Sequence, residues 1–174
     1  MTEHADSSPQ AVVTATFAHL KSHDLDAMLK LYHDDAVDDF VVVGEFRGKS
    51  AIRGFFGELI GAFPDFDVDV VQMTGVDQQA VVQWHATGTF TGAPFQGIHP
   101  TGRSVELRGC DVFQVEDGKV RSNTIYYDGL AFARQIGLLP REGSATDKAM
   151  TAAFNASTDI RARLHRHPEP AQAL

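Results

Sequence analysis

The sequence predicts an α+β protein in which helices come first and a curved antiparallel sheet follows. Apolar residues recur at helical spacing in three separate stretches between residues 9 and 63. Four strand-like runs then follow one another without an intervening helix, at 66–73, 80–90, 104–115 and 119–128. Helices followed by a meander are typical of α+β domains and argue against a βαβ repeat. We therefore expect a cone-shaped barrel with a cavity at its wide end.

About three helices are expected before the sheet. Ser8 followed by Pro9 marks the first, because serine caps a helix and proline suits its first turn, and this helix should run to about Lys21. Asp24 opens a second, short helix, and Ser50 is expected to cap the third.

The segment "AVDDFVVVGEFRG" that precedes the third helix predicts a strand and a turn. It overlaps an acidic cluster formed by Asp34, Asp35, Asp38 and Asp39. The cluster lacks the defined ligand spacing of a metal site, so we interpret it as a solvated turn and expect no metal.

The pair Asp117-Gly118 predicts a two-residue hairpin turn between the last two strands. If these two residues form the loop, Asp111 lies opposite Thr124. Side chains alternate between the faces of a sheet, so Asp111, Tyr126 and Asp128 then share one face. A slip of one residue in either strand would separate Asp111 from Asp128.

Asp128 stands at the junction of the last strand and a following helix, in the apolar run "IYYDGLAFARQIGLLP". It is either the N-cap of the helix that begins near Leu130 or an acid that faces a pocket. In an apolar pocket the pKa of a carboxyl group rises, which allows proton transfer near neutral pH. Asp111 has the same two interpretations, as a hydrogen-bonded structural acid or a working one.

Composition excludes several classes of function. With 15 Lys and Arg against 23 Asp and Glu the net charge is −8, and no long basic run is present, so we expect no nucleic-acid partner. One cysteine allows no internal disulfide. No window approaches 18 apolar residues and the first ten residues do not form a signal peptide, so we expect no membrane contact and a cytoplasmic location.

The chain is predicted to form one domain over residues 1–140, with a loose N-terminus at 1–10, followed by a helical extension at 141–174. In the extension four apolar residues lie roughly on one helix side: Met150, Phe154, Ile160 and Leu164.

The order of elements resembles the nuclear-transport-factor-2-like fold. Within that fold the chain resembles the SnoaL-like polyketide cyclases and the related ester cyclases, over roughly residues 12–139. The resemblance rests on six segments in the right order: "GKSAIRGFF" (48–56), "AFPDFDVDV" (62–70), "VVQWHATGTFTG" (81–92), "GIHPTGRSVELRG" (97–109), "FQVEDGKV" (113–120) and "YYDGLAFARQIG" (126–137).

The resemblance implies a reaction without cofactor on a hydrophobic polycyclic or polyketide-like molecule, and a homodimer. Members of the group use an acid at the end of the last strand for an intramolecular aldol ring closure, and Asp128 matches that position. The chain departs from the pattern at Phe90, where relatives often have His, and in "RSNTIYYD", where many have Glu-His-Trp. The substrate is therefore not carried over.

Three other functions remain open. Limonene-epoxide hydrolases share the fold, but their chemistry needs an Arg between two acids, and the corresponding strand here has "QWHA" (83–86). A ketosteroid-isomerase-like arrangement would use Tyr126, Asp111 and Asp128. The third alternative is a module that binds a small ligand without chemistry.

Further residues are predicted around the cavity. His99 lies in a loop that resembles the family's lid and is either solvated or a proton relay. Trp84 is expected to face inward in preference to His85, as an aromatic wall. The predicted substrate-binding residues are Trp84, Tyr126, Phe90, Phe17, Phe55 and, by analogy or as plain core, Tyr32.

Overall fold

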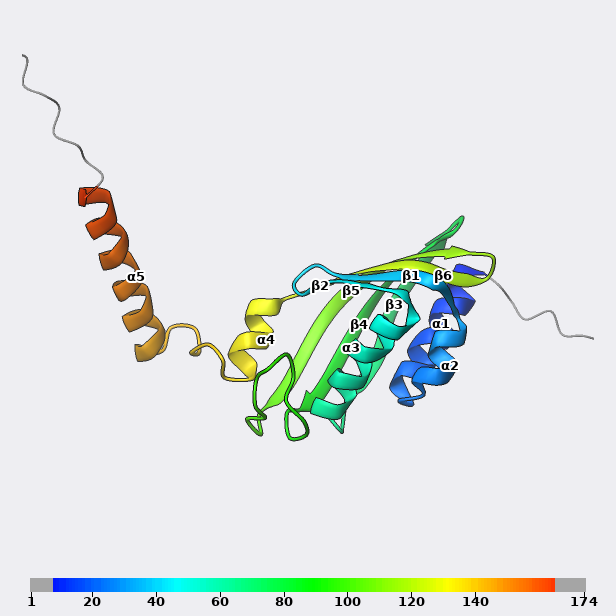
Figure 1. Ribbon diagram of the computed structural model, residues 1–174, viewed down its shortest axis with the longest axis horizontal. Helices are drawn as coiled ribbons and strands as arrows, with labels where there is room; N and C mark the ends of the chain where they lie inside the picture. The colour runs from blue at the N-terminus through cyan, green and yellow to red at the C-terminus, as the bar shows by residue number, and fades with distance from the viewer. Residues whose placement is uncertain (1–7, 165–174) are drawn as a thin grey trace, which may run out of the picture.

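A computed structural model describes residues 8–164 (Figure 1). The elements, in chain order, are α1 (Pro9–Lys21), α2 (Leu25–Lys30), β1 (Tyr32–Phe40), β2 (Gly44–Arg47), α3 (Gly48–Ala62), β3 (Asp67–Val76), β4 (Gln79–Thr89), β5 (Ser104–Glu116), β6 (Lys119–Tyr127), α4 (Gly129–Gln135) and α5 (Ala145–Leu164).

The strands form one curved, open sheet in the order β2-β1-β6-β5-β4-β3, and helices α1, α2 and α3 lie together on one face of it (Figure 1). The predicted α+β class, the three helices and the four long strands are confirmed. The sheet is mixed, however, because β1 runs parallel to β6 while every other pair is antiparallel.

The helix starts agree with the sequence at two of three positions. The Ser8 and Asp24 side chains accept hydrogen bonds from backbone N–H groups of the first turns of α1 and α2. The prediction for Ser50 is wrong, because α3 begins at Gly48, where a φ of +79° turns the chain sharply out of β2. The expected loose segment at 1–10 is also wrong at its end, since Pro9 already belongs to α1; residues 1–7 lie outside the described residues.

The β5–β6 hairpin contains a bulge that changes the predicted register. Its turn lies at Asp117 and Gly118, both with positive φ (49° and 71°), as expected for a two-residue loop. Val120 then pairs with Val115, but Ser122 pairs with Gln114, so that Arg121 is the extra residue of a β-bulge.

Beyond the bulge, each side chain of β6 lies on the face of the sheet opposite to the predicted one. Asp111 lies opposite Ile125 instead of Thr124, and Cys110 lies opposite Tyr126. Because side chains alternate, the shift turns Tyr127 toward the helix-covered face and Tyr126 away from it. The predicted common face of Asp111, Tyr126 and Asp128 is therefore wrong.

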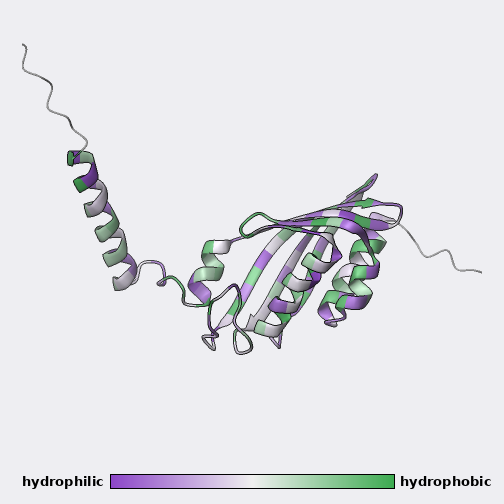
Figure 2. Ribbon diagram, in the orientation of Figure 1, coloured by the Kyte–Doolittle hydropathy of each residue, from purple (hydrophilic) through white to green (hydrophobic). Residues whose placement is uncertain are grey.

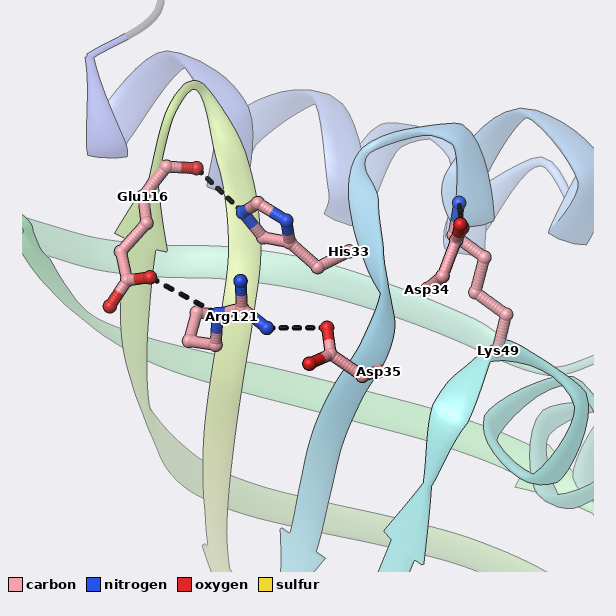
Figure 3. Close-up of polar contacts among 6 residues, drawn as sticks. All are labelled: His33, Asp34, Asp35, Lys49, Glu116 and Arg121. Atoms are coloured by element: carbon pink, nitrogen blue, oxygen red, sulfur yellow. Dashed lines mark hydrogen bonds and ion pairs between the residues drawn. The ribbon is translucent and has the colours of Figure 1, made fainter.

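Charged side chains hold this bulge at the surface (Figure 3). Arg121 donates hydrogen bonds to Asp35 of β1 and, over 3.1 Å, to Glu116 of β5. His33 contacts the Glu116 carbonyl oxygen at 2.9 Å. These contacts join β1, β5 and β6 at the point where both strand pairs lose their regular register.

Helix α5 lies away from the body, at the far end of the chain from α1 and α2 (Figure 1). None of its residues is buried, although hydrophobic stretches alternate with hydrophilic ones along it (Figure 2). Arg134 of α4 approaches Asp147 of α5 at 3.6 Å. Within residues 8–164, no helix combines the length and hydrophobicity that crossing a membrane requires.

Candidate functional site

An apolar cavity lies between the sheet and the helices. Its volume is about 110 Å³, which is smaller than the roughly 300–1,000 Å³ usual for small-molecule sites. Seven of the twelve phenylalanines line it: Phe17, Phe40, Phe55, Phe56, Phe66, Phe95 and Phe132. Asp111 of β5 is the single acid among the described residues that line this cavity.

Two donors hold the Asp111 carboxylate. Trp84 Nε1 donates to Asp111 Oδ1 over 2.7 Å, and Asn123 Nδ2 donates to Asp111 Oδ2 over 3.1 Å. Each oxygen retains a further lone pair for a ligand. The carboxylate is thus fixed in orientation and still able to accept a proton.

The environment of Asp111 places its pKa near neutrality. Its exposed fraction is 6%. Burial raises the pKa of Asp111 to about 6, against the opposing effect of the hydrogen bonds from Trp84 and Asn123. At pH 7 the group is mostly ionised, yet its proton affinity is high enough for a general base.

The position of Trp84 depends on a glycine on the neighbouring strand. Trp84 of β4 pairs with Gly109 of β5, and a Cβ at position 109 would lie 2.1 Å from Trp84 Cζ2. Without a side chain at position 109 the indole lies across β5, where its N–H reaches Asp111. Trp84 also lines the cavity, as predicted from the sequence.

A second acid is buried close to Asp111. Asp38 of β1 has no exposed surface, and neither of its carboxylate oxygens has a hydrogen-bond partner within residues 8–164. Burial raises the pKa of Asp38 well above its usual value, and the charge of Asp111 raises it further. Tyr32 is also buried; its pKa is raised by burial and then by Asp38 and Asp111. The predicted solvated turn is therefore wrong for Asp38.

Asp128 takes the first of its two predicted interpretations. Its Oδ1 accepts a hydrogen bond from Ala131 N over 2.9 Å, which makes it the N-cap of α4. The side chain is exposed and does not line the apolar cavity; it borders a groove on the opposite face of the sheet, beside Cys110 and Tyr126. The expectation that Asp128 faces a dry pocket with Asp111 is therefore wrong.

The other predicted residues are distributed over three environments. Phe17 and Phe55 line the cavity, as expected. Phe90 is fully buried and stacks on Phe63 with ring centroids 5.0 Å apart, so it belongs to the core instead of the cavity wall. His99 is exposed and Tyr126 is 49% exposed, and neither lines the cavity. The ketosteroid-isomerase-like set of Tyr126, Asp111 and Asp128 is not brought together.

Several cavity residues were missed by sequence reasoning. Ile125, Tyr127 and Phe132 line the cavity because the bulge sets the face of β6 and α4 follows it. Asp38 and Asn123 were missed as well. The alternation of Ala36, Asp38 and Phe40 in β1 was the signal that could have placed Asp38 inside. Among residues 8–164, no three His, Cys, Asp or Glu side chains are grouped to hold a metal ion.

Comparison with known proteins assigns the class of this fold. A family model described as SnoaL-like polyketide cyclase matches residues 10–136. The chain therefore belongs to the SnoaL-like polyketide cyclase family, and the predicted resemblance is confirmed. No curated protein matched the sequence significantly.

Solved structures with the same fold come from several bacteria. A proposed SnoaL-like polyketide cyclase from Jannaschia sp. CCS1 is 22% identical with a TM-score of 0.70, over 80% of this chain and 99% of that one. IdmH, a proposed polyketide cyclase from Streptomyces antibioticus, is 23% identical (TM-score 0.64; 74% and 98% covered). AclR, a proposed hydroxylase from Streptomyces galilaeus, is 19% identical (TM-score 0.67; 91% and 98% covered). At these identities the likeness shows the fold alone.

Proposed function

We propose that the protein is a cofactor-independent cyclase or isomerase that moves a proton beside a carbonyl group of a flat, hydrophobic, polyketide-like molecule, with Asp111 as the acid/base. The observation that supports this most is a nearly neutral-pKa carboxylate that lines a cavity made otherwise of apolar and aromatic side chains. Membership of the SnoaL-like polyketide cyclase family supports a cyclase-type reaction.

In the proposed reaction the Asp111 carboxylate removes a proton from the carbon next to a substrate carbonyl. The electron pair of that C–H bond forms an enolate. In a cyclase the enolate carbon then bonds to a second carbonyl carbon of the same molecule, and Asp111 returns its proton to the alkoxide that results. In an isomerase the proton returns to another carbon. Neither sequence needs an external oxidant or reductant.

Tyr127 is the residue we assign to the developing enolate oxygen. It lines the cavity from the end of β6, and burial raises the pKa of its hydroxyl group, which stays protonated and able to donate. A donor aimed at a developing oxyanion in a site that excludes water contributes substantially to catalysis. Tyr127 thus replaces Tyr126, which the sequence predicted as a substrate-binding residue, as the tyrosine that lines the cavity.

A ligand-binding module without chemistry is the second candidate. It is favoured by the two hydrogen bonds to Asp111, because a carboxylate held by Trp84 and Asn123 is also what a structural role requires. In that case the cavity would still bind a flat apolar ligand.

Deuterium exchange into α-tetralone, a flat bicyclic aromatic ketone, separates these functions. We expect the protein to accelerate exchange at the carbon beside the carbonyl in D₂O, followed by NMR. Asp111→Asn should slow this exchange by about 10²- to 10⁴-fold, the usual contribution of a general base. Tyr127→Phe should slow it by up to about 10²- to 10³-fold.

Asp128→Asn is the matched control, because asparagine also caps helices well and the residue lies outside the cavity. Binding of α-tetralone without exchange by any variant would favour the binding module. Loss of exchange in Asp128→Asn with normal exchange in Asp111→Asn would return the catalytic role to Asp128.

The proposal includes a homodimer, which the family resemblance implies, and the cytoplasmic location that the sequence predicts. Light scattering during size-exclusion chromatography should give a mass near twice 19.0 kDa. A mass of one chain over the working concentration range would remove the dimer from the proposal without affecting the cavity.

A further inference from the structure

Three buried oxygen atoms lie on two neighbouring strands without a donor. They are both carboxylate oxygens of Asp38 and Oδ1 of Asn123. The exposed fractions of the two residues are 0% and 2%. Buried acceptors without a hydrogen bond are costly and require an explanation in a native structure.

Sheet geometry places the Asp38 and Asn123 side chains next to each other. Asp38 and Asn123 are register partners in the parallel β1–β6 pair, where neighbouring strands lie about 4.8 Å apart. Both side chains are on the helix-covered face, as shown by the burial of Phe40 two residues after Asp38 and of Ile125 two residues after Asn123. An ionised Asp38 and Asn123 Oδ1 are both acceptors and cannot satisfy each other, whereas a proton on Asp38 makes it a donor.

We propose that Asp38 is a positioning residue that remains protonated and donates its O–H to Asn123 Oδ1, which fixes the Asn123 amide with Nδ2 toward Asp111. This inference rests on the proposed function only because it takes Asp111, whose hydrogen bond Asp38 would orient, as the acid/base. The resulting chain runs from Asp38 through Asn123 to Asp111, and Trp84 donates from the other side.

The surroundings explain why the proton stays on Asp38. Asp111 has two N–H donors that stabilise its charge, whereas Asp38 has none within the described chain. The titratable groups that face Asp38 are Tyr32 on its own strand and Asp111 on β5. The buried side chains of α1 and α3 are uncharged. Two acids whose environments separate their proton affinities in this way take different roles.

Two substitutions at position 38 separate positioning from plain packing. Asp38→Asn keeps a neutral donor for Asn123 Oδ1, whereas Asp38→Leu keeps the approximate volume and removes the donor. We expect Asp38→Leu to raise the pKa of Asp111 by about one unit, a tenfold change in proton affinity, because the amide is no longer held in its donating orientation. Asp38→Asn should leave the pKa of Asp111 within about 0.3 unit.

The pKa of each carboxyl group is read from its ¹³C resonance during a pH titration, without any substrate. The inference is overturned if Asp38 of the unmodified protein titrates near 3.9, or if Asp38→Asn and Asp38→Leu shift the pKa of Asp111 equally. This titration involves no turnover, so it tests the inference about Asp38 separately from the proposed function. The inference can be wrong while Asp111→Asn still slows exchange, and it can be right if the protein binds a ligand without catalysis.

If Asp38→Leu does not fold, the pH dependence of unfolding provides the test. A buried acid that must be protonated lowers the folding equilibrium constant by up to about tenfold for each pH unit above about 4. Asp38→Asn should remove one such dependence, so its stability relative to the unmodified protein rises with pH. An unchanged difference between pH 4 and pH 7 would contradict the inference.

Discussion

Replacing Asp111 with Asn should make the stability of the protein less dependent on pH. The pKa of Asp111 is raised from 3.8 to about 6 in the folded chain, and that difference of about two units corresponds to about 3 kcal/mol. Because the folded-state pKa is the higher one, this stability is present below about pH 4 and is lost as the pH rises through about 6. The variant lacks the titration, so its free energy of unfolding should gain about 2.5 kcal/mol relative to the unmodified protein between pH 4 and pH 7, since part of the difference has already developed at pH 4.

Urea unfolding at pH 4, 5, 6 and 7, followed by circular dichroism, measures this difference. The constant effect of the substitution on packing and hydrogen bonds cancels, because only the change with pH is compared. Asp38 is present in both proteins, so its own contribution to the pH dependence largely cancels as well. The exposed acid Asp128, replaced by Asn, controls for the loss of one negative charge. A difference that stays constant within about 0.5 kcal/mol would refute a buried, titrating Asp111.

Three further predictions follow from packing and charge. Gly109→Ala should lower the free energy of unfolding in urea by about 1–3 kcal/mol and raise the pKa of Asp111, because the new Cβ would lie 2.1 Å from Trp84 Cζ2. An unchanged pKa of Asp111 would show that the close packing of Trp84 on Gly109 does not hold the indole. Arg121→Gln should cost less than about 1 kcal/mol, and less still in 1 M NaCl, since its ion pairs are partly exposed; a salt-independent loss would contradict an ionic origin. Truncation after Pro140 should move the melting temperature by no more than about 2 °C, because α5 has no buried residue; a larger fall would contradict a separate body at 1–140.

The sequence was sufficient to predict the main helices and strands, but it did not predict which side chains of β6 face the helices. Long apolar runs and helical spacing predicted the three helices, the four long strands and the hairpin turn at Asp117, because these signals are local. The face of β6 depends on where the bulge falls, and Arg121 became the extra residue through contacts with Asp35, 86 positions earlier in the chain. No local pattern records such a pairing.

The candidate site was predicted only in part, because some of its residues lie on regularly paired strands and others follow the bulge in β6. Trp84 lies on β4 and Asp111 on β5, two strands whose pairing is regular throughout. Both residues line the cavity, as expected for Trp84 and for one of the two interpretations of Asp111. Asp128 follows the bulge, so the register argument failed there, and the local capping signal described it better. Asp38 was hidden in an acidic run of which two members, Asp34 and Asp35, are exposed.

A crystal structure with a bound planar ketone such as α-tetralone tests the central claim most directly. The account predicts the ligand in the phenylalanine-lined cavity, with the carbon beside its carbonyl within about 3–3.5 Å of an Asp111 carboxylate oxygen. Electron density for the ligand in the opposite groove, beside Tyr126 and Asp128, with the cavity closed by its own side chains, would contradict it.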